Sequence, residues 1–242
     1  MCRIIFTYKK QNPTYFRTHI LDEFQDYYMR YCKTDKLSYG VVGFETTDRN
    51  DKNNNNNNTF IENRGTGMPK CDSFELSCMP TKYAMYHVRY KNGPGPSTIE
   101  NTHPMMNHND RYVFMHNGRI KCLDTPGRTD SQVFFDHILY QYTHTRPQTH
   151  THIHTQTHTY TQSTLRDALE RTIALLKQPL INVVLCDRHT GEFIVYHHGG
   201  NVPSLFWDSR RGIVTNWHSP HSKQIRLLWR PSCGKKIQHI NI

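Results

Sequence analysis

Short runs of apolar and β-branched residues, separated by polar stretches, recur along this chain. Such runs have the length and composition of buried strands. The clearest four are residues 2–8, 39–44, 83–90 and 111–115. Two later pairs of runs have turn residues between them and predict β-hairpins. These pairs are 181–186 with 192–196, and 204–207 with 212–215. No clear periodicity is visible beyond His218.

Helical spacing appears in three other segments. Residues 20–31 predict a helix from mixed aromatic and apolar positions, and residues 131–142 repeat Val133, Phe134 and Ile138 at helical intervals. The third segment has leucine or isoleucine at positions 165, 169, 173 and 176, with Ser163 as a candidate cap. Strands outnumber helices, so the pattern predicts a layered α+β domain.

Two low-complexity tracts interrupt this pattern. Residues 48–58 end in six consecutive asparagines, and residues 143–162 repeat threonine and histidine. The first tract has no apolar residue and the second has only Ile153 and Tyr160, so we expect two disordered insertions in a single domain over residues 2–242. The tracts also account for part of the low hydrophobic share of 36% and the mean hydropathy of -0.76.

The charge and the cysteines narrow the class of protein. The net charge is +10, but lysine and arginine are scattered and form no run longer than a pair. We therefore expect no nucleic-acid partner. The seven cysteines show no CxxC pattern, no cationic and apolar leader opens the chain, and no apolar run reaches the length of a membrane helix. These features favour a cytoplasmic protein with reduced thiols and no membrane partner.

Cys2 directly follows the initiator methionine. Removal of Met1 would leave a thiol and a free α-amine on one residue, and that amine titrates near 7.7–8.0. Such an amine can act as the general base toward its own thiol. Alone, a cysteine in this position is more often a chance residue of a buried strand.

Acyl transfer also needs oxyanion donors and anchors for the substrate. Arg89 ends a predicted strand and can hold a carboxylate, although a surface ion pair is the simpler interpretation. Asn117 and Gly118 follow another strand in a predicted turn, where an amide and a backbone N–H can converge on one oxygen; an ordinary hairpin is the alternative. Asp130 precedes a helix, where it can cap the helix, bind an α-ammonium, or do both.

Five short motifs occur together in the order and approximate spacing of a known family. They are Met1-Cys2-Arg3, His87-Val88-Arg89, Asn101-Thr102-His103-Pro104, Phe114-Met115-His116-Asn117-Gly118 and Thr129-Asp130-Ser131. With them the sequence resembles the class II glutamine amidotransferases, within the N-terminal-nucleophile hydrolases. Residues 165–173 (LRDALERTI) extend the resemblance toward the amidotransferase-like subunit of the fungal glutathione-degradation complex.

The resemblance implies a four-layer αββα sandwich and a role for each matched residue. Cys2 would attack the γ-carbonyl of a γ-glutamyl group and form a thioester, with Asn117 and Gly118 as the oxyanion hole. Arg89 would bind the α-carboxylate of the substrate and Asp130 its α-amine, while His103 would support the substrate site. The resemblance implies no metal or organic cofactor.

Some positions depart from the family pattern. Residues 90–95 (YKNGPG) replace a shorter family stretch after Arg89, and Leu37-Ser38-Tyr39-Gly40 replaces an Asp-Gly-aromatic-Gly pattern. The sequence thus leaves three functions open. It could be a γ-glutamyl hydrolase acting on glutamine, glutathione or a related compound, with a peptidase-like subunit as a possible partner. It could be a glutaminase that feeds ammonia to a partner synthase, or an inactive scaffold that binds γ-glutamyl ligands.

The histidines of the Thr/His tract could suggest a metal site, and His87 could suggest an acid or base. We favour neither interpretation. Alternating histidines at 144, 150, 152, 154 and 158 resemble a chelating tract, but their neighbours are threonine and glutamine without carboxylates. We therefore predict no physiological metal site there. His87 is expected to be a packed strand histidine, because the α-amine already supplies a base.

Overall fold

The computed structural model describes residues 3–7, 34–44, 60–67, 83–91, 97–144, 164–176, 180–198, 206–208, 213–215, 226–227 and 236–240. The chain divides into two compact units, one made of residues 1–118 and 180–242 and the other of residues 119–179. Each unit is described by itself. None of the helices in the described ranges is long and apolar enough to cross a membrane.

The first unit contains two antiparallel sheets. One sheet has seven strands in the order β11-β9-β10-β1-β4-β2-β3. Its strands are β1 (Arg3–Thr7), β2 (Leu37–Phe44), β3 (Phe60–Thr66), β4 (Tyr83–Tyr90), β9 (Phe206–Asp208), β10 (Ile213–Thr215) and β11 (Arg226–Leu227). Single-turn helices η2 (Thr34–Lys36) and η4 (Ile99–Asn101) belong to the same unit.

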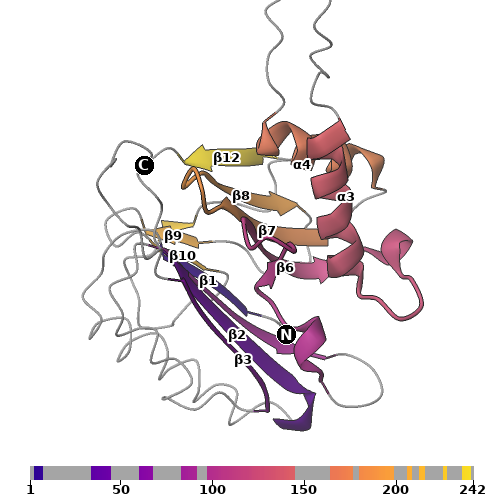
Figure 1. Cartoon of the computed structure of the whole chain (residues 1–242), viewed down its shortest axis with the longest axis vertical. Coiled ribbons are helices and arrows are strands. Elements are labelled where there is room, and N and C mark those ends of the chain that lie inside the picture. The colour runs from indigo at the N-terminus through magenta and orange to yellow at the C-terminus, as the bar shows by residue number, and fades with distance from the viewer. Residues whose placement is uncertain are drawn as a thin grey trace, which may run out of the picture. The chain divides into compact units, whose positions relative to one another are not determined.

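The second sheet has five strands in the order β12-β8-β7-β6-β5. Figure 1 labels the first four of them. They are β5 (Met105–Met106), β6 (Tyr112–Arg119), β7 (Leu180–Asp187), β8 (Phe193–His198) and β12 (Lys236–Ile240). A partly buried ion pair joins the start of β6 to the end of β7. There Arg111 donates to both carboxylate oxygens of Asp187.

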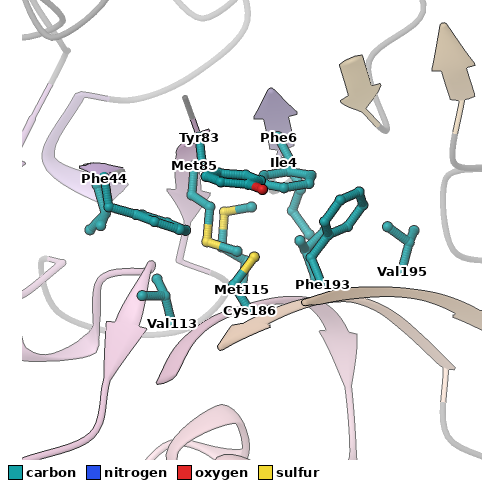
Figure 2. Packing of buried hydrophobic residues seen from close by; sticks show 12 residues of the cluster. Ile4, Phe6, Phe44, Tyr83, Met85, Val113, Met115, Cys186, Phe193 and Val195 are labelled. Carbon is teal, nitrogen blue, oxygen red and sulfur yellow. The ribbon is translucent and has the colours of Figure 1, made fainter. Parts of the chain in front are cut away.

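Side chains of both sheets form one apolar core. Every second residue of a strand points to the same face of its sheet, and the inward positions of both sheets join in a single cluster. Figure 2 shows Phe6 and Tyr83 above Met85 and Met115, with Phe193 beside them. The rings of Phe6 and Phe193 meet edge to face at 4.7 Å between centroids. We call the aromatic part of this layer the apolar end; its members are Phe6, Phe44, Tyr83 and Phe193.

The second unit is a pair of packed helices with a single-turn helix, η5 (Lys121–Leu123). Helix α3 (Asp130–His144) begins with a reciprocal cap, because Thr129 Oγ1 accepts from the Gln132 N–H and Gln132 Oε1 accepts from the Thr129 N–H. Helix α4 (Leu165–Leu175) has the same device between Thr164 and Asp167. The capping residue is therefore Thr164; Ser163, the residue expected from sequence, lies outside the described residues.

Most of the predicted elements that fall on described residues are confirmed. The four early strands, the helices near 131–142 and 165–176, and both hairpins are present. The predicted helix at 20–31 and the bulk of both low-complexity tracts lie outside the described residues. The two antiparallel sheets agree with the expected α+β class, while the four-layer arrangement and the single domain over 2–242 stay predictions.

One local prediction is wrong. His116-Asn117-Gly118 is not a turn, because β6 continues through all three residues to Arg119. Asn-Gly favours a hairpin where both residues are free to leave the sheet. Here the Asn117 side chain is buried. Gly118 instead has a φ of +142°, a conformation that glycine alone adopts without strain.

Candidate active site

Arg89 lies near the end of β4 on the face that looks toward the second sheet. Tyr83 and Met85 of the same strand belong to the core between the sheets, and alternation puts His87 and Arg89 on that face as well. The Nη1 atom of Arg89 is buried and has no hydrogen-bond partner among the described residues. The strand thus changes from apolar to polar along one face, and Arg89 is its last inward residue.

Asn117 of β6 faces the same inter-sheet layer as Arg89, but from the second sheet. Val113 and Met115 of β6 belong to the shared core, so alternation gives Asn117 the same inward face. Its side chain is buried, and Gly118 follows with its positive φ. The expected oxyanion donors therefore lie on consecutive residues of an ordered strand.

His103 lies in a segment that packs directly on β2. The peptide bond between His103 and Pro104 is cis. A Cβ atom added to Gly40 would lie 2.1 Å from the His103 carbonyl oxygen. Only glycine leaves room for this close approach of two backbones. Gly40 thus sets the position of His103 on the sheet.

Three buried histidines connect the strands at this end of the layer. The His103 ring lies 4.5 Å from that of His87 and 6.4 Å from that of His116, measured between centroids. Neither ring nitrogen of His87 or His103 has a well-aligned hydrogen-bond partner within the described ranges. We call the group formed by Ser38, His87, Arg89, His103 and Asn117 the polar end of the inter-sheet layer.

Burial keeps the imidazoles of His87 and His103 neutral. The pKa of His87 is lowered from 6.5 to about 3, mainly by loss of solvation and then by the charges of Arg89 and His116, while a hydrogen bond with the His116 main chain opposes the shift. The pKa of His103 also falls well below its usual value, first through burial and then through His87, His116, Arg89 and Arg64. The described residues contain no group of three or more ligating side chains arranged to hold a metal ion.

Asp130 belongs to the second unit, which is described apart from the unit that holds Arg89 and Asn117. Its carboxylate accepts hydrogen bonds from the backbone N–H groups of Ile120 at 2.8 Å and Ser131 at 2.9 Å. These bonds anchor the start of α3, whose capping residue is Thr129. A carboxylate has further lone pairs, so binding of an α-ammonium by Asp130 stays a prediction.

Cys2 lies outside the described residues, so its role stays a prediction. Its neighbour Arg3 begins β1 and pairs with Val88, the residue before Arg89. The first described residue of the chain therefore lies beside the polar end of β4.

Several residues at this end were not singled out as functional from the sequence. Ser38 of β2 pairs with Arg89 in the sheet register. Arg64 of β3 pairs with Gly40 and forms an ion pair with Glu62. Asn182 and His197, paired across β7 and β8, share a buried hydrogen bond of 2.5 Å. No sequence signal was available for Ser38, because only the strand register shows which residue it faces.

Comparison with solved structures gives the fold of the chain. Glutamine phosphoribosylpyrophosphate amidotransferase from B. subtilis, complexed with ADP and GMP, matches at a TM-score of 0.50 and 16% identity. A structure described as the allosteric regulatory enzyme of purine biosynthesis matches at a TM-score of 0.55 and 16% identity. Each match covers 89% of this chain but 42% of the other.

Sequence comparison adds no relative. No protein-family model matches the sequence, and no curated protein matches it significantly. The structural likeness nevertheless covers most of the chain. It shows that this chain shares the fold of the matched part of these two enzymes.

Proposed function

We propose that this protein hydrolyses the amide bond of a γ-glutamyl compound, with Cys2 as the nucleophile after removal of Met1. One observation carries the proposal: Arg89 and Asn117 face the same inter-sheet layer from different sheets, in the fold of a glutamine amidotransferase. The pairing of Arg3 with Val88 supports it, because Cys2 directly precedes Arg3 in the chain. The mechanism requires the Cys2 side chain to share the face of Ile4 and Phe6.

The proposed reaction has two steps. The α-amine of Cys2 takes the thiol proton, and the sulfur attacks the γ-carbonyl carbon. The C–N bond then breaks, the leaving amine takes up the proton, and a γ-glutamyl thioester remains on Cys2. Water next attacks the thioester carbonyl, so that glutamate leaves and the thiol is restored. The Asn117 amide and the Gly118 N–H would stabilise the oxyanion in both steps.

Arg89, His103 and Asp130 would orient the substrate. The Arg89 guanidinium suits the α-carboxylate because it offers paired N–H donors, and Asp130 would take the α-ammonium. Neutral His87 and His103 add no charge to that of Arg89 and Arg64. The names of the structural neighbours make glutamine the first substrate to test, and the sequence resemblance makes glutathione the second.

The first experiment asks whether Cys2 is a free N-terminal nucleophile. Intact-mass spectrometry should show the loss of Met1, and a γ-glutamyl diazo-ketone should add one equivalent to the protein. Labelling should disappear in Cys2→Ala and persist in Cys122→Ala, which removes an exposed thiol and serves as the matched control. A retained Met1 would leave no free amine on Cys2 and would exclude the mechanism.

The second experiment identifies the substrate and separates the alternatives. Glutamate release should be measured with glutamine, glutathione and γ-glutamyl methylamide, using the parent protein and Cys2→Ala. Release by the parent alone supports the hydrolase. Labelling of Cys2 without release of glutamate from any of the three compounds would instead favour the scaffold that binds γ-glutamyl ligands.

A further inference from the structure

Ser38 stands opposite Arg89 in the sheet. The register of β2 and β4 pairs these two residues, and the neighbouring inward pairs are Gly40 with His87 and Val42 with Met85. Val42 and Met85 belong to the inter-sheet core, so alternation gives Ser38 and Arg89 the same face. Directly opposed residues of an antiparallel pair have Cβ atoms about 4.5–5.5 Å apart. A single small group can therefore contact both side chains.

Both side chains carry a buried polar atom that lacks a partner. Ser38 is fully buried, and its Oγ atom makes no hydrogen bond to any described residue. The same holds for the Nη1 atom of Arg89. Folded proteins leave few buried polar atoms unpaired, and each such atom calls for an explanation, such as a bound ligand or a functional role. Two unpaired groups on one face of adjacent strands thus indicate a shared ligand.

The charges nearby specify what that ligand is. Arg64 lies on β3, the strand beside β2, and forms an ion pair with Glu62. His87 and His103 are kept neutral by burial. Within the described ranges no acidic side chain forms an ion pair with Arg89. The guanidinium has only donors, and the hydroxyl can act as a donor. A carboxylate, with two oxygens and about four acceptor sites, matches both groups at once.

We propose that Ser38 is a substrate-binding residue whose hydroxyl donates to the same carboxylate as Arg89, the α-carboxylate of the γ-glutamyl group. This inference rests on the proposed function and assigns one more contact to the same site. The family pattern described above has glycine at this position, so the hydroxyl is a feature of this chain. It makes binding depend on a free α-carboxylate more strongly than Arg89 alone does.

The test compares affinity with stability in a Cys2→Ala background, where the ligand is not consumed. L-Glutamine and glutathione are titrated by calorimetry, and the melting temperature is measured without ligand. Ser38→Ala should weaken binding by about tenfold or more, because the lost bond is to a charged group. The melting temperature should stay the same or rise, because the substitution removes an unpaired buried hydroxyl.

Ser97→Ala is the matched control. The Ser97 hydroxyl donates to the Lys36 carbonyl at 2.7 Å, so its loss should lower the melting temperature and leave affinity within twofold. Affinity within twofold for Ser38→Ala would overturn the inference, as would a fall in melting temperature as large as that of Ser97→Ala. If the Cys2→Ala parent binds neither compound, the proposed function fails and the Ser38 assignment fails with it.

Discussion

The two ends of the inter-sheet layer are built from the same strands but differ in chemistry. At the apolar end Phe6, Phe44, Tyr83 and Phe193 stack and meet edge to face (Figure 2). At the polar end the continuing strands bring together Ser38, His87 and Arg89, all with buried atoms that lack partners in the described part of the chain. Burial of apolar rings stabilises the fold at the apolar end. At the polar end, burial of polar groups without partners destabilises it.

This difference separates the part of the strands that packs the core from the part that we propose binds substrate. Along β4 the inward face changes from Tyr83 and Met85 to His87 and Arg89 within a single unbroken strand. The packed half of the strand therefore fixes the direction of the half that carries His87 and Arg89. Buried polar groups without partners cost free energy in the unliganded protein, which a ligand that pairs with them recovers.

The largest expected effect is at the apolar end. Phe193→Ala should lower the free energy of unfolding by about 3–5 kcal/mol, because it removes a fully buried ring that contacts Phe6. Urea denaturation followed by fluorescence measures the loss. Ser38→Ala, at the polar end, is the comparison variant and should cost nothing. A loss below about 1 kcal/mol for Phe193→Ala would contradict the assignment of stability to the apolar end.

Gly40→Ala should have the next largest effect, at the polar end. Its Cβ would lie 2.1 Å from the His103 carbonyl oxygen, so the segment at His103-Pro104 must move. We expect a loss of about 1–3 kcal/mol together with weaker binding of L-glutamine to the Cys2→Ala protein. Denaturation and calorimetry measure the two effects.

The control for this substitution is Gly127→Ala. Gly127 has a φ of +77°, and a Cβ atom added there would meet no other atom within 4 Å, so alanine brings backbone strain without a clash. It should cost about 1–2 kcal/mol and leave ligand affinity unchanged. Equal affinity for Gly40→Ala and the parent would show that the position of His103 does not matter for binding.

The last prediction concerns pH. The polar end should make the free energy of unfolding depend on pH, with a small change for each pH unit. His87 has a folded pKa of about 3 against 6.5 for a free histidine. The unfolded chain takes up a proton first as the pH falls. The contribution of this residue to stability is therefore fully present above pH 6.5 and declines from there toward pH 3, by up to about 1.4 kcal/mol per pH unit. His103, with a pKa lowered in the same direction, steepens the decline.

The measurement is urea denaturation at intervals from pH 7.5 to pH 4.5. His87→Gln should have a shallower profile than the parent over this range. The same substitution at His189, whose ring is exposed, provides the control. Identical profiles for His87→Gln and the parent would mean that His87 is not held neutral in the folded protein.

Sequence patterns predicted the strands of the core because a strand buried on both faces is a continuous run of apolar and β-branched residues. The strand at Tyr83–Tyr90 was predicted with its bounds correct for this reason. Patterns failed where the cause is not local. β3 contains Glu62 and Arg64 and has little apolar content of its own, and it forms because it pairs along nearly the whole of β2. The two-residue β11 has no periodicity to detect.

The candidate site was predictable in part for the same reason. Arg89 and Asn117 were singled out by motifs, but their common inward face follows only from the register of each sheet with the core. The Asn117-Gly118 turn was predicted wrongly because the local signal for a hairpin and the signal for a strand glycine with positive φ are the same dipeptide. Ser38 could not be recognised at all, since a lone serine in a strand acquires meaning only from the residue opposite it.

The position of the second unit in the chain has a consequence for evolution. Strands β6 and β7 are neighbours in one sheet, yet residues 119–179 are inserted between them. The Thr/His tract lies within this insertion, between two helices that pack on each other. For flexible connections, each doubling of length costs only about 0.6 kcal/mol. If the tract is disordered, as its sequence predicts, we expect repeat expansion or contraction there to leave the strands that hold Arg89 and Asn117 in place.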